Sequence, residues 1–192
     1  MQPGDATELL LIRHAPALHG GRLAGRRDVA ADCSDQAAIG ALRGVLAGVE
    51  SRVTSPALRC RQTAAALWPG AAPPADPRLW EQDFGTWEGC AFDRLPDLGA
   101  LSLADLAVYS PPEGESFAAV CARTEPVFAE LAGRGGRIAV VVHAGVVRAG
   151  LAFALGSVPA ALAFHVAPLS LTRIRVGATG HCTVLDVNRI AG

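Results

Sequence analysis

Hydrophobic residues along this chain gather in short, uninterrupted runs, which are typical of strands buried on both faces of a sheet. The runs and their flanking breakers predict strands at 8–13, 52–54, 78–80, 138–142, 170–176 and 182–187. The last two are expected to form a hairpin joined near Gly177 to Gly180. The other strands are separated by stretches long enough to hold a crossover connection.

Between these runs, hydrophobic residues recur at helical spacing and predict helices at about 35–47, 55–67, 116–132 and 146–155. Ser34 or Asp35 is expected to cap the first helix, and Ser55 with Pro56 to open the second. Strands alternating with helices predict an α/β fold of three α/β/α layers around a mostly parallel sheet. We expect one domain over 1–192, with an irregular insertion at 84–112 as a possible lid over the ligand.

The composition narrows the classes of function that the protein can have. The 192 residues carry a net charge of -1 and no basic block, so we expect neither a nucleic-acid nor a membrane partner. The five cysteines are scattered and form no CxxC pair, which argues against a disulfide framework and a metal site. With no basic segment followed by a long apolar run at the start, the expected location is cytoplasmic.

All 17 basic residues are arginine. Schiff-base chemistry and the lysine-dependent phosphate loop are therefore excluded, and an anion must be held by arginine, histidine or backbone N–H groups. Two of the predicted strands end in histidine, at His14 and His143. Ligands of open α/β sheets bind beyond the carboxyl ends of strands, so both rings are expected to face one crevice.

Four segments resemble, in order, the signatures of the histidine phosphatase (phosphoglycerate-mutase-like) superfamily. They are Arg13-His14-Ala15, the run from Ser55 to Thr63 that contains Arg59, the run from Glu81 to Gly89, and the run from His143 to Arg148. The resemblance spans most of the chain and implies the phosphoglycerate-mutase-like fold. It also implies phosphatase activity on a small-molecule phosphomonoester, through a phosphohistidine and without any cofactor or metal.

The resemblance also implies the role of each residue. His14 would be the nucleophile, with its other ring nitrogen donating to a nearby backbone carbonyl. Arg13, Arg59 and a protonated His143 would bind and neutralise the phosphoryl oxygens. Glu81 would protonate the leaving oxygen and later activate water. Asp83 and Glu88 remain alternatives for the role assigned to Glu81.

Two positions depart from the family pattern. Ala15 stands where the family usually has glycine, and Gly20 stands where a longer signature has asparagine. Arg26 and Arg27 are the candidate substrate-binding residues that would replace the missing asparagine contact.

Within the family, four segments look most like α-ribazole-phosphate phosphatases of cobalamin synthesis. They are the runs from Gly25 to Val29, from Phe84 to Gly89, from Pro112 to Ser116 and from His143 to Arg148. A phosphoglycerate mutase and a non-catalytic, phosphate-binding regulatory protein are the alternatives. The oligomeric state is left open, with a homodimer as one option.

Overall fold

A five-stranded sheet forms the centre of the molecule in the computed structural model, which describes residues 6–191. The strands are β1 (Thr7–Arg13), β2 (Ser51–Thr54), β3 (Gly136–Val142), β4 (Leu171–Val176) and β5 (Cys182–Arg189). Their order in the sheet is β2-β3-β1-β4-β5. β2, β3 and β1 pair in parallel, whereas β4 is antiparallel to both β1 and β5. Only β4 therefore runs against the other strands, and the prediction of a mostly parallel sheet is confirmed.

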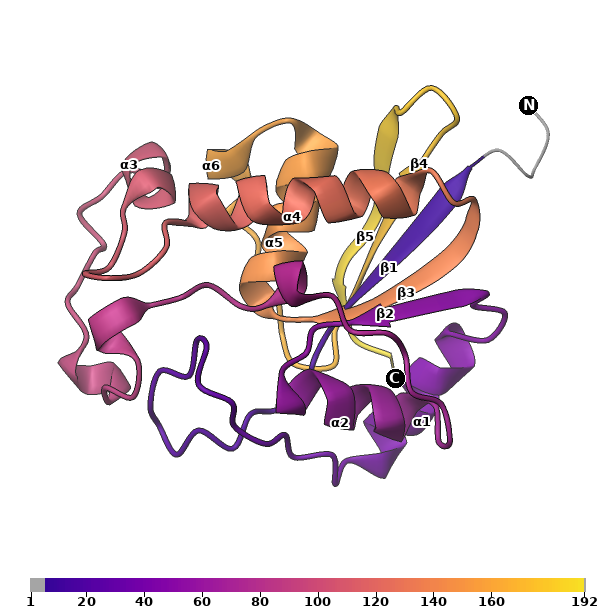
Figure 1. Cartoon of the computed structure of the whole chain (residues 1–192), viewed down its shortest axis with the longest axis horizontal. Helices are drawn as coiled ribbons and strands as arrows, with labels where there is room; N and C mark the ends of the chain where they lie inside the picture. The colour runs from indigo at the N-terminus through magenta and orange to yellow at the C-terminus, as the bar shows by residue number, and fades with distance from the viewer. Residues whose placement is uncertain (1–5, 192) are drawn as a thin grey trace.

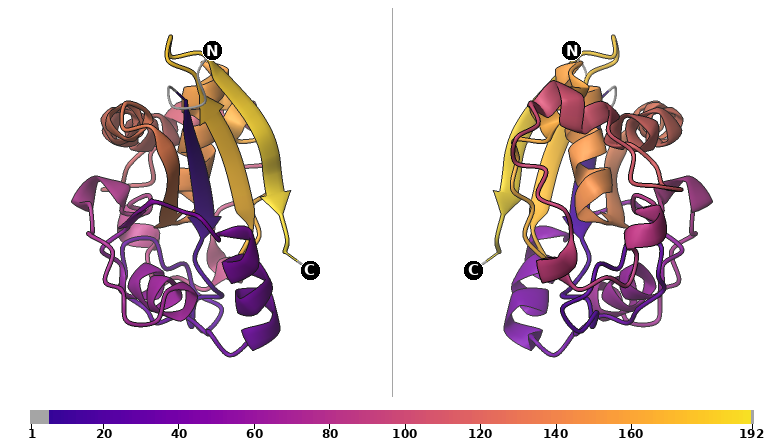
Figure 2. Two further views of the ribbon diagram at one scale, coloured as in Figure 1. Left: turned by 90° about the vertical axis from the view of Figure 1, so that its right-hand side faces the viewer. Right: turned by 90° about the vertical axis from the view of Figure 1, so that its left-hand side faces the viewer.

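Helices cover both faces of the sheet (Figures 1 and 2). The helices α1 (Gln36–Val45) and α2 (Leu58–Leu67) pack on one face, and α4 (Phe117–Ala132) and α5 (Ala144–Leu155) pack on the other. Alternate residues of β1 serve the two faces, with Leu9 in the core beneath α4 and α5 and Leu10 in the core beneath α1 and α2. This two-sided burial explains why the strand reads as an uninterrupted hydrophobic run, and it confirms the predicted three-layer fold.

Three helix ends show regular capping chemistry, and the first of them confirms a cap predicted from the sequence. The Asp35 carboxylate accepts from the Ala38 N–H at 2.9 Å and caps α1. The Ser116 hydroxyl accepts from the Ala119 N–H at 3.1 Å and caps α4. Gly156, with φ of 64°, ends α5 in the left-handed conformation that glycine adopts without strain.

Two sequence-based expectations are wrong. Residues 78–80 form no strand, because Pro77–Leu79 is a 3-10 helix (η1) whose start is capped by the Asp76 carboxylate. The second helix begins at Leu58 rather than at Ser55, and it has no side-chain cap. The Ser55 hydroxyl instead contacts His143 Nε2 at 2.8 Å, so the residue serves the crevice rather than the helix.

The segment 84–112 is irregular, as expected. It holds two 3-10 helices, η2 (Gly85–Trp87) and η3 (Phe92–Arg94), and the short helix α3 (Leu103–Val108). A further short helix, α6 (Val158–Ala161), follows α5. No helix within residues 6–191 combines the length and the apolar character needed to cross a bilayer.

The segment 84–112 pairs with the loop 15–31 rather than with the sheet. An isolated bridge joins Arg22 to Ala91. The Leu23 N–H donates to the Cys90 carbonyl at 2.9 Å, and the Gly89 N–H donates to the Leu23 carbonyl at 2.8 Å. Both segments lie at the left of Figure 1, beyond the ends of β1 and β3. They are therefore placed to cover the crevice predicted there.

Candidate active site

Two neighbouring parallel strands bring the predicted histidines together. Arg13 at the end of β1 is in register with Val142 at the end of β3, and His14 and His143 are the next residues. The His14 N–H donates to the Val142 carbonyl at 2.9 Å, which continues the ladder by one bond. The two imidazole rings meet edge to face with their centroids 5.2 Å apart.

His14 is held as a neutral imidazole with one nitrogen available for attack. Nδ1 lies 2.6 Å from the Ala15 carbonyl, which can only accept, so Nδ1 carries the proton and Nε2 has the free electron pair. Burial lowers the pKa of His14 to about 3, and the charges of Arg59 and Arg13 act in the same direction. The ring is therefore unprotonated near neutral pH, as a nucleophile requires.

Arg59 joins the nucleophile to the loop above it. Its Nε donates to His14 Nε2 at 3.3 Å, and its two terminal nitrogens donate to the carbonyls of Gly25 at 2.7 Å and Arg27 at 3.0 Å. The side chain is fully buried although it lies in the first turn of α2. Helical spacing alone could equally have placed it in solvent.

His143 is completely buried beside His14. Trp80 stacks on its ring, with an angle of 7° between the ring planes, and the Ser55 hydroxyl contacts its Nε2. Burial first, and then the charge of Arg59, hold the pKa of His143 well below its ordinary value. The sequence led us to expect a protonated ring, but in this site His143 is neutral and has one N–H to donate.

Glu81 lies in the segment after η1 and lines the pocket above the two histidines. One carboxylate oxygen accepts from the Gly145 N–H at 3.3 Å, at the start of α5, and the other accepts from the Gln82 N–H at 3.0 Å. A Cβ atom on Gly145 would lie 2.3 Å from Glu81 Oε1, so a larger residue there would displace the carboxylate from this position.

The two alternative acids do not line this pocket. Asp83 accepts from the Gly85 N–H at 2.8 Å and turns the chain there. Glu88 accepts from the N–H groups of Arg26 and Phe84, at 2.6 and 3.2 Å, and holds their loops together. Of the three acids considered from the sequence, the structure brings only Glu81 to the histidines.

Two more guanidinium groups line the pocket. Arg13 donates to the Val166 carbonyl at 2.6 Å, and its buried Nε has no protein partner. Arg148 donates through Nε to the Phe164 carbonyl at 2.9 Å. Neither Arg148 nor His19 was among the site residues predicted from the sequence, yet both line the pocket. The position of Arg148, one helical turn after Ala144, was the signal that could have identified it.

Arg26 and Arg27 are not brought to the pocket. Arg26 Nε donates to the Glu81 carbonyl at 3.3 Å, and its Nη2 pairs with Glu115 at 3.3 Å. Arg27 is exposed, and its guanidinium lies against Gly89. Arg26 thus contacts the backbone that carries Glu81, and neither arginine is among the residues that line the pocket.

Glu115 connects Arg26 to a second arginine. Arg123 donates to both carboxylate oxygens of Glu115 at 2.9 Å, and also to the carbonyls of Arg78 and Trp80. Burial alone would raise the pKa of Glu115, but the hydrogen bonds from Arg123 hold it below its usual value. This network therefore holds the backbone before and after Glu81 in place through hydrogen bonds.

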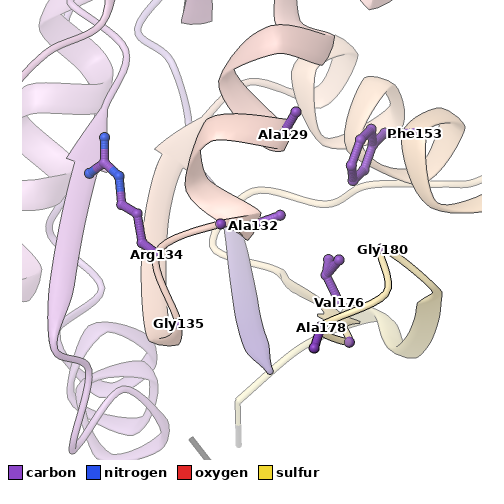
Figure 3. Close-up of a pocket in the computed structure, with 10 residues that line it drawn as sticks. Ala129, Ala132, Arg134, Gly135, Phe153, Val176, Ala178 and Gly180 are labelled. Atoms are coloured by element: carbon purple, nitrogen blue, oxygen red, sulfur yellow. The ribbon is translucent and has the colours of Figure 1, made fainter. Parts of the chain in front are cut away.

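The pocket above the histidines has a volume of about 260 Å³. A larger cavity, of about 510 Å³, lies between the end of α4, the β4–β5 turn and Phe153 of α5 (Figure 3). Its wall is mostly small residues, including Ala129, Ala132 and Ala178, and Arg134 is the one charged residue among them. The larger cavity therefore lacks the nucleophile, acid and anion-binding groups that converge in the smaller one.

Curated relatives match part of the chain. The Bifunctional protein Rv2228c of Mycobacterium tuberculosis and the Uncharacterized protein Mb2253c of Mycobacterium bovis are each 35% identical over 125 residues. The match covers 59% of this chain and 34% of each relative. The chain thus spans about a third of the length of the curated relatives that it matches.

Solved structures match almost the whole chain. Mycobacterial hydrolase 1 is 26% identical with a TM-score of 0.84, covering 97% of this chain and 100% of its own. An Escherichia coli K-12 protein, described provisionally as an alpha-ribazole-5'-P phosphatase, is 26% identical with a TM-score of 0.81, covering 97% and 98%. A mycobacterial glucosyl-3-phosphoglycerate phosphatase complexed with VO3 is 25% identical with a TM-score of 0.82, covering 94% and 98%.

One family of proteins matches the part of the chain that holds both the sheet and the pocket. The family described as Histidine phosphatase superfamily (branch 1) matches residues 9–189, from β1 to the end of β5. That range includes both histidines and every arginine that lines the pocket. The chain belongs to branch 1 of the histidine phosphatase superfamily.

Proposed function

We propose that this enzyme hydrolyses small-molecule phosphomonoesters through a phosphohistidine formed on His14. The observation that carries the proposal is the state of the His14 ring. Its Nδ1–H is fixed on the Ala15 carbonyl at 2.6 Å, so the Nε2 electron pair lies in the pocket among arginines. Nucleophilic catalysis of this kind divides one difficult displacement into two easier ones.

In the first step, His14 Nε2 attacks phosphorus while the bond from phosphorus to the leaving oxygen breaks. The Glu81 carboxyl group transfers its proton to that oxygen, so the product leaves as a neutral alcohol. The Arg59 Nε–H, which donates to Nε2 in the free enzyme, turns to a phosphoryl oxygen as the electron pair of Nε2 enters the new bond.

In the second step, Glu81 takes a proton from water as the water attacks phosphorus. The bond from nitrogen to phosphorus breaks, the electron pair returns to Nε2, and orthophosphate leaves. Arg13, Arg59 and the N–H of His143 stabilise the charge on the phosphoryl oxygens in both steps. Removing one such group typically lowers the rate by a factor of about 10² to 10³.

The α-ribazole-phosphate phosphatases provide the most specific candidate substrate, α-ribazole 5′-phosphate, which would place the enzyme in cobalamin synthesis. Support comes from the sequence segments noted above and from the similarity to the Escherichia coli structure. In this proposal, 1–192 act as one domain and 84–112 act as a lid. The five free thiols are consistent with a reducing cytoplasm.

The first test is the variant His14→Ala. We expect it to abolish phosphate release from 4-nitrophenyl phosphate and to prevent acid-labile labelling of the protein by a ³²P-labelled substrate. His181→Ala removes an exposed histidine and serves as the matched control, with activity retained. Wild-type turnover in the His14 variant would rule out His14 as the nucleophile.

A further inference from the structure

Hydrocarbon side chains make up part of the pocket lining. They are Phe84, Phe92, Phe117, Leu23 and Leu162. Phe117 is buried, whereas Phe92 is 49% exposed. The His19 ring meets Phe92 edge to face, with their centroids 5.2 Å apart. An exposed aromatic side chain beside a catalytic pocket offers a contact surface to the rest of a substrate.

The charged groups of the pocket suit a phosphate dianion. The lining includes the guanidinium groups of Arg13, Arg59 and Arg148, the carboxyl group of Glu81 and the ring of His19. His14 adds no charge, because burial lowers its pKa. A phosphomonoester carries a charge of about -1.5 to -2 at pH 7, so the phosphate balances most of the guanidinium charge. A carboxylate on the leaving group would lose its hydration against the phenylalanine rings.

Arg148 is the residue that could contradict this view, because a free guanidinium group would attract a carboxylate on the leaving group. Its Nε already donates to the Phe164 carbonyl at 2.9 Å, which ties the guanidinium group to the backbone. The carboxylate-bearing substrate in the test below shows whether Arg148 binds a second anion.

We propose that Phe84, Phe92 and Phe117 form a subsite for an uncharged leaving group with a flat ring, and that they select such phosphomonoesters over carboxylate-bearing ones. This inference rests on the phosphatase activity proposed above and adds the substrate class. The volume of about 260 Å³ lies just below the range of about 300–1,000 Å³ that is common for small-molecule pockets. A phosphate and one small ring would fill it, and a larger body would extend past Phe92 into solvent.

Three alcohol phosphates test the proposal, since their similar leaving groups remove differences in intrinsic reactivity. We expect kcat/KM to be highest for benzyl phosphate, lower for glycerol phosphate and lowest for 3-phosphoglycerate. Phe92→Ala should lower kcat/KM for benzyl phosphate by roughly three- to tenfold, mainly through KM, and should lower it less for glycerol phosphate. Phe92→Tyr, which keeps a ring, should restore the preference.

The matched control is Val108→Ala, which removes an exposed apolar side chain from the same segment outside the pocket. It should change none of the three values. Equal kcat/KM for the three substrates, or a preference for 3-phosphoglycerate, would overturn the subsite while leaving the phosphatase activity intact. Failure to hydrolyse any phosphomonoester, 4-nitrophenyl phosphate included, would instead overturn the proposed function.

Discussion

A single glycine sets the position of the proposed proton donor. The Gly145 N–H holds Glu81, and a methyl group on Gly145 would overlap the carboxylate. We predict that Gly145→Ala displaces Glu81 and lowers kcat for benzyl phosphate by about 10² to 10³. The loss for 4-nitrophenyl phosphate should be much smaller, because its leaving group needs no proton.

Steady-state kinetics with both substrates check this prediction. Gly44→Ala is the control, because a Cβ atom there meets nothing within 4 Å. Equal losses on the two substrates would mean that the substitution disturbs the nucleophile or the fold rather than the acid.

At the residue scale, the sequence predicted those site residues that lie within a motif of the family. Arg13, His14, Arg59, Glu81 and His143 were all expected at one crevice, and they do line or border it. The neutral state of His143 was not foreseen, because it depends on complete burial beneath Trp80 and beside Arg59. Burial of that kind arises from packing between segments that are distant in the sequence, so it cannot be predicted from a local sequence pattern.

At the element scale, the network around Glu115 joins the start of α4, the segment after η1 and the loop of Arg26. We predict that Glu115→Gln lowers the free energy of unfolding by about 1–3 kcal/mol, since hydrogen bonds to charged groups contribute on that order. It should also lower kcat more for benzyl phosphate than for 4-nitrophenyl phosphate, because the backbone of Glu81 is released.

Denaturant unfolding and the same pair of substrates measure the two effects. Glu125→Gln changes an exposed acid on α4, the helix that begins after Glu115, and should alter neither. If Glu115→Gln lowers stability but reduces both activities equally, the network supports the fold without positioning the acid.

Elements were predictable from the sequence where a hydrophobic run or a helical period extends over several residues. β1, β3 and α4 have such patterns and were found close to their expected bounds. The three residues at 78–80 carry no period, so the cap from Asp76 and the fixed backbone of Pro77 decided their conformation. The direction of β4 could not be predicted either, since an apolar run looks the same in either direction.

At the scale of the whole molecule, two buried histidines make stability depend on pH. Their pKa values are lowered in the folded state, to about 3 for His14, so the unfolded chain binds protons more readily as the pH falls. Their contribution is complete above about pH 6.5 and is lost as the pH falls from there toward 3. Each histidine contributes a slope of up to about 1.4 kcal/mol per pH unit.

We therefore predict that the free energy of unfolding falls between pH 6.5 and 5, and that His14→Asn and His143→Gln each reduce this slope. Urea unfolding at a series of pH values measures it. Above about pH 7.5, the curves of the variants should run parallel to that of the wild type. Unchanged slopes between pH 6.5 and 5 would show that neither ring resists protonation in the folded protein.

The pairing of loop 15–31 with segment 84–112 keeps the residues around the substrate apart from the residues that react. The hydrogen bonds of Leu23 with Gly89 and Cys90 join the loop and the segment, the two coverings of the pocket, to each other. The histidines instead follow the ends of β1 and β3. Exchanging both coverings as one matched cassette should therefore redirect the catalyst to other esters without rebuilding its reactive centre, whereas exchanging either alone would leave unmatched edges.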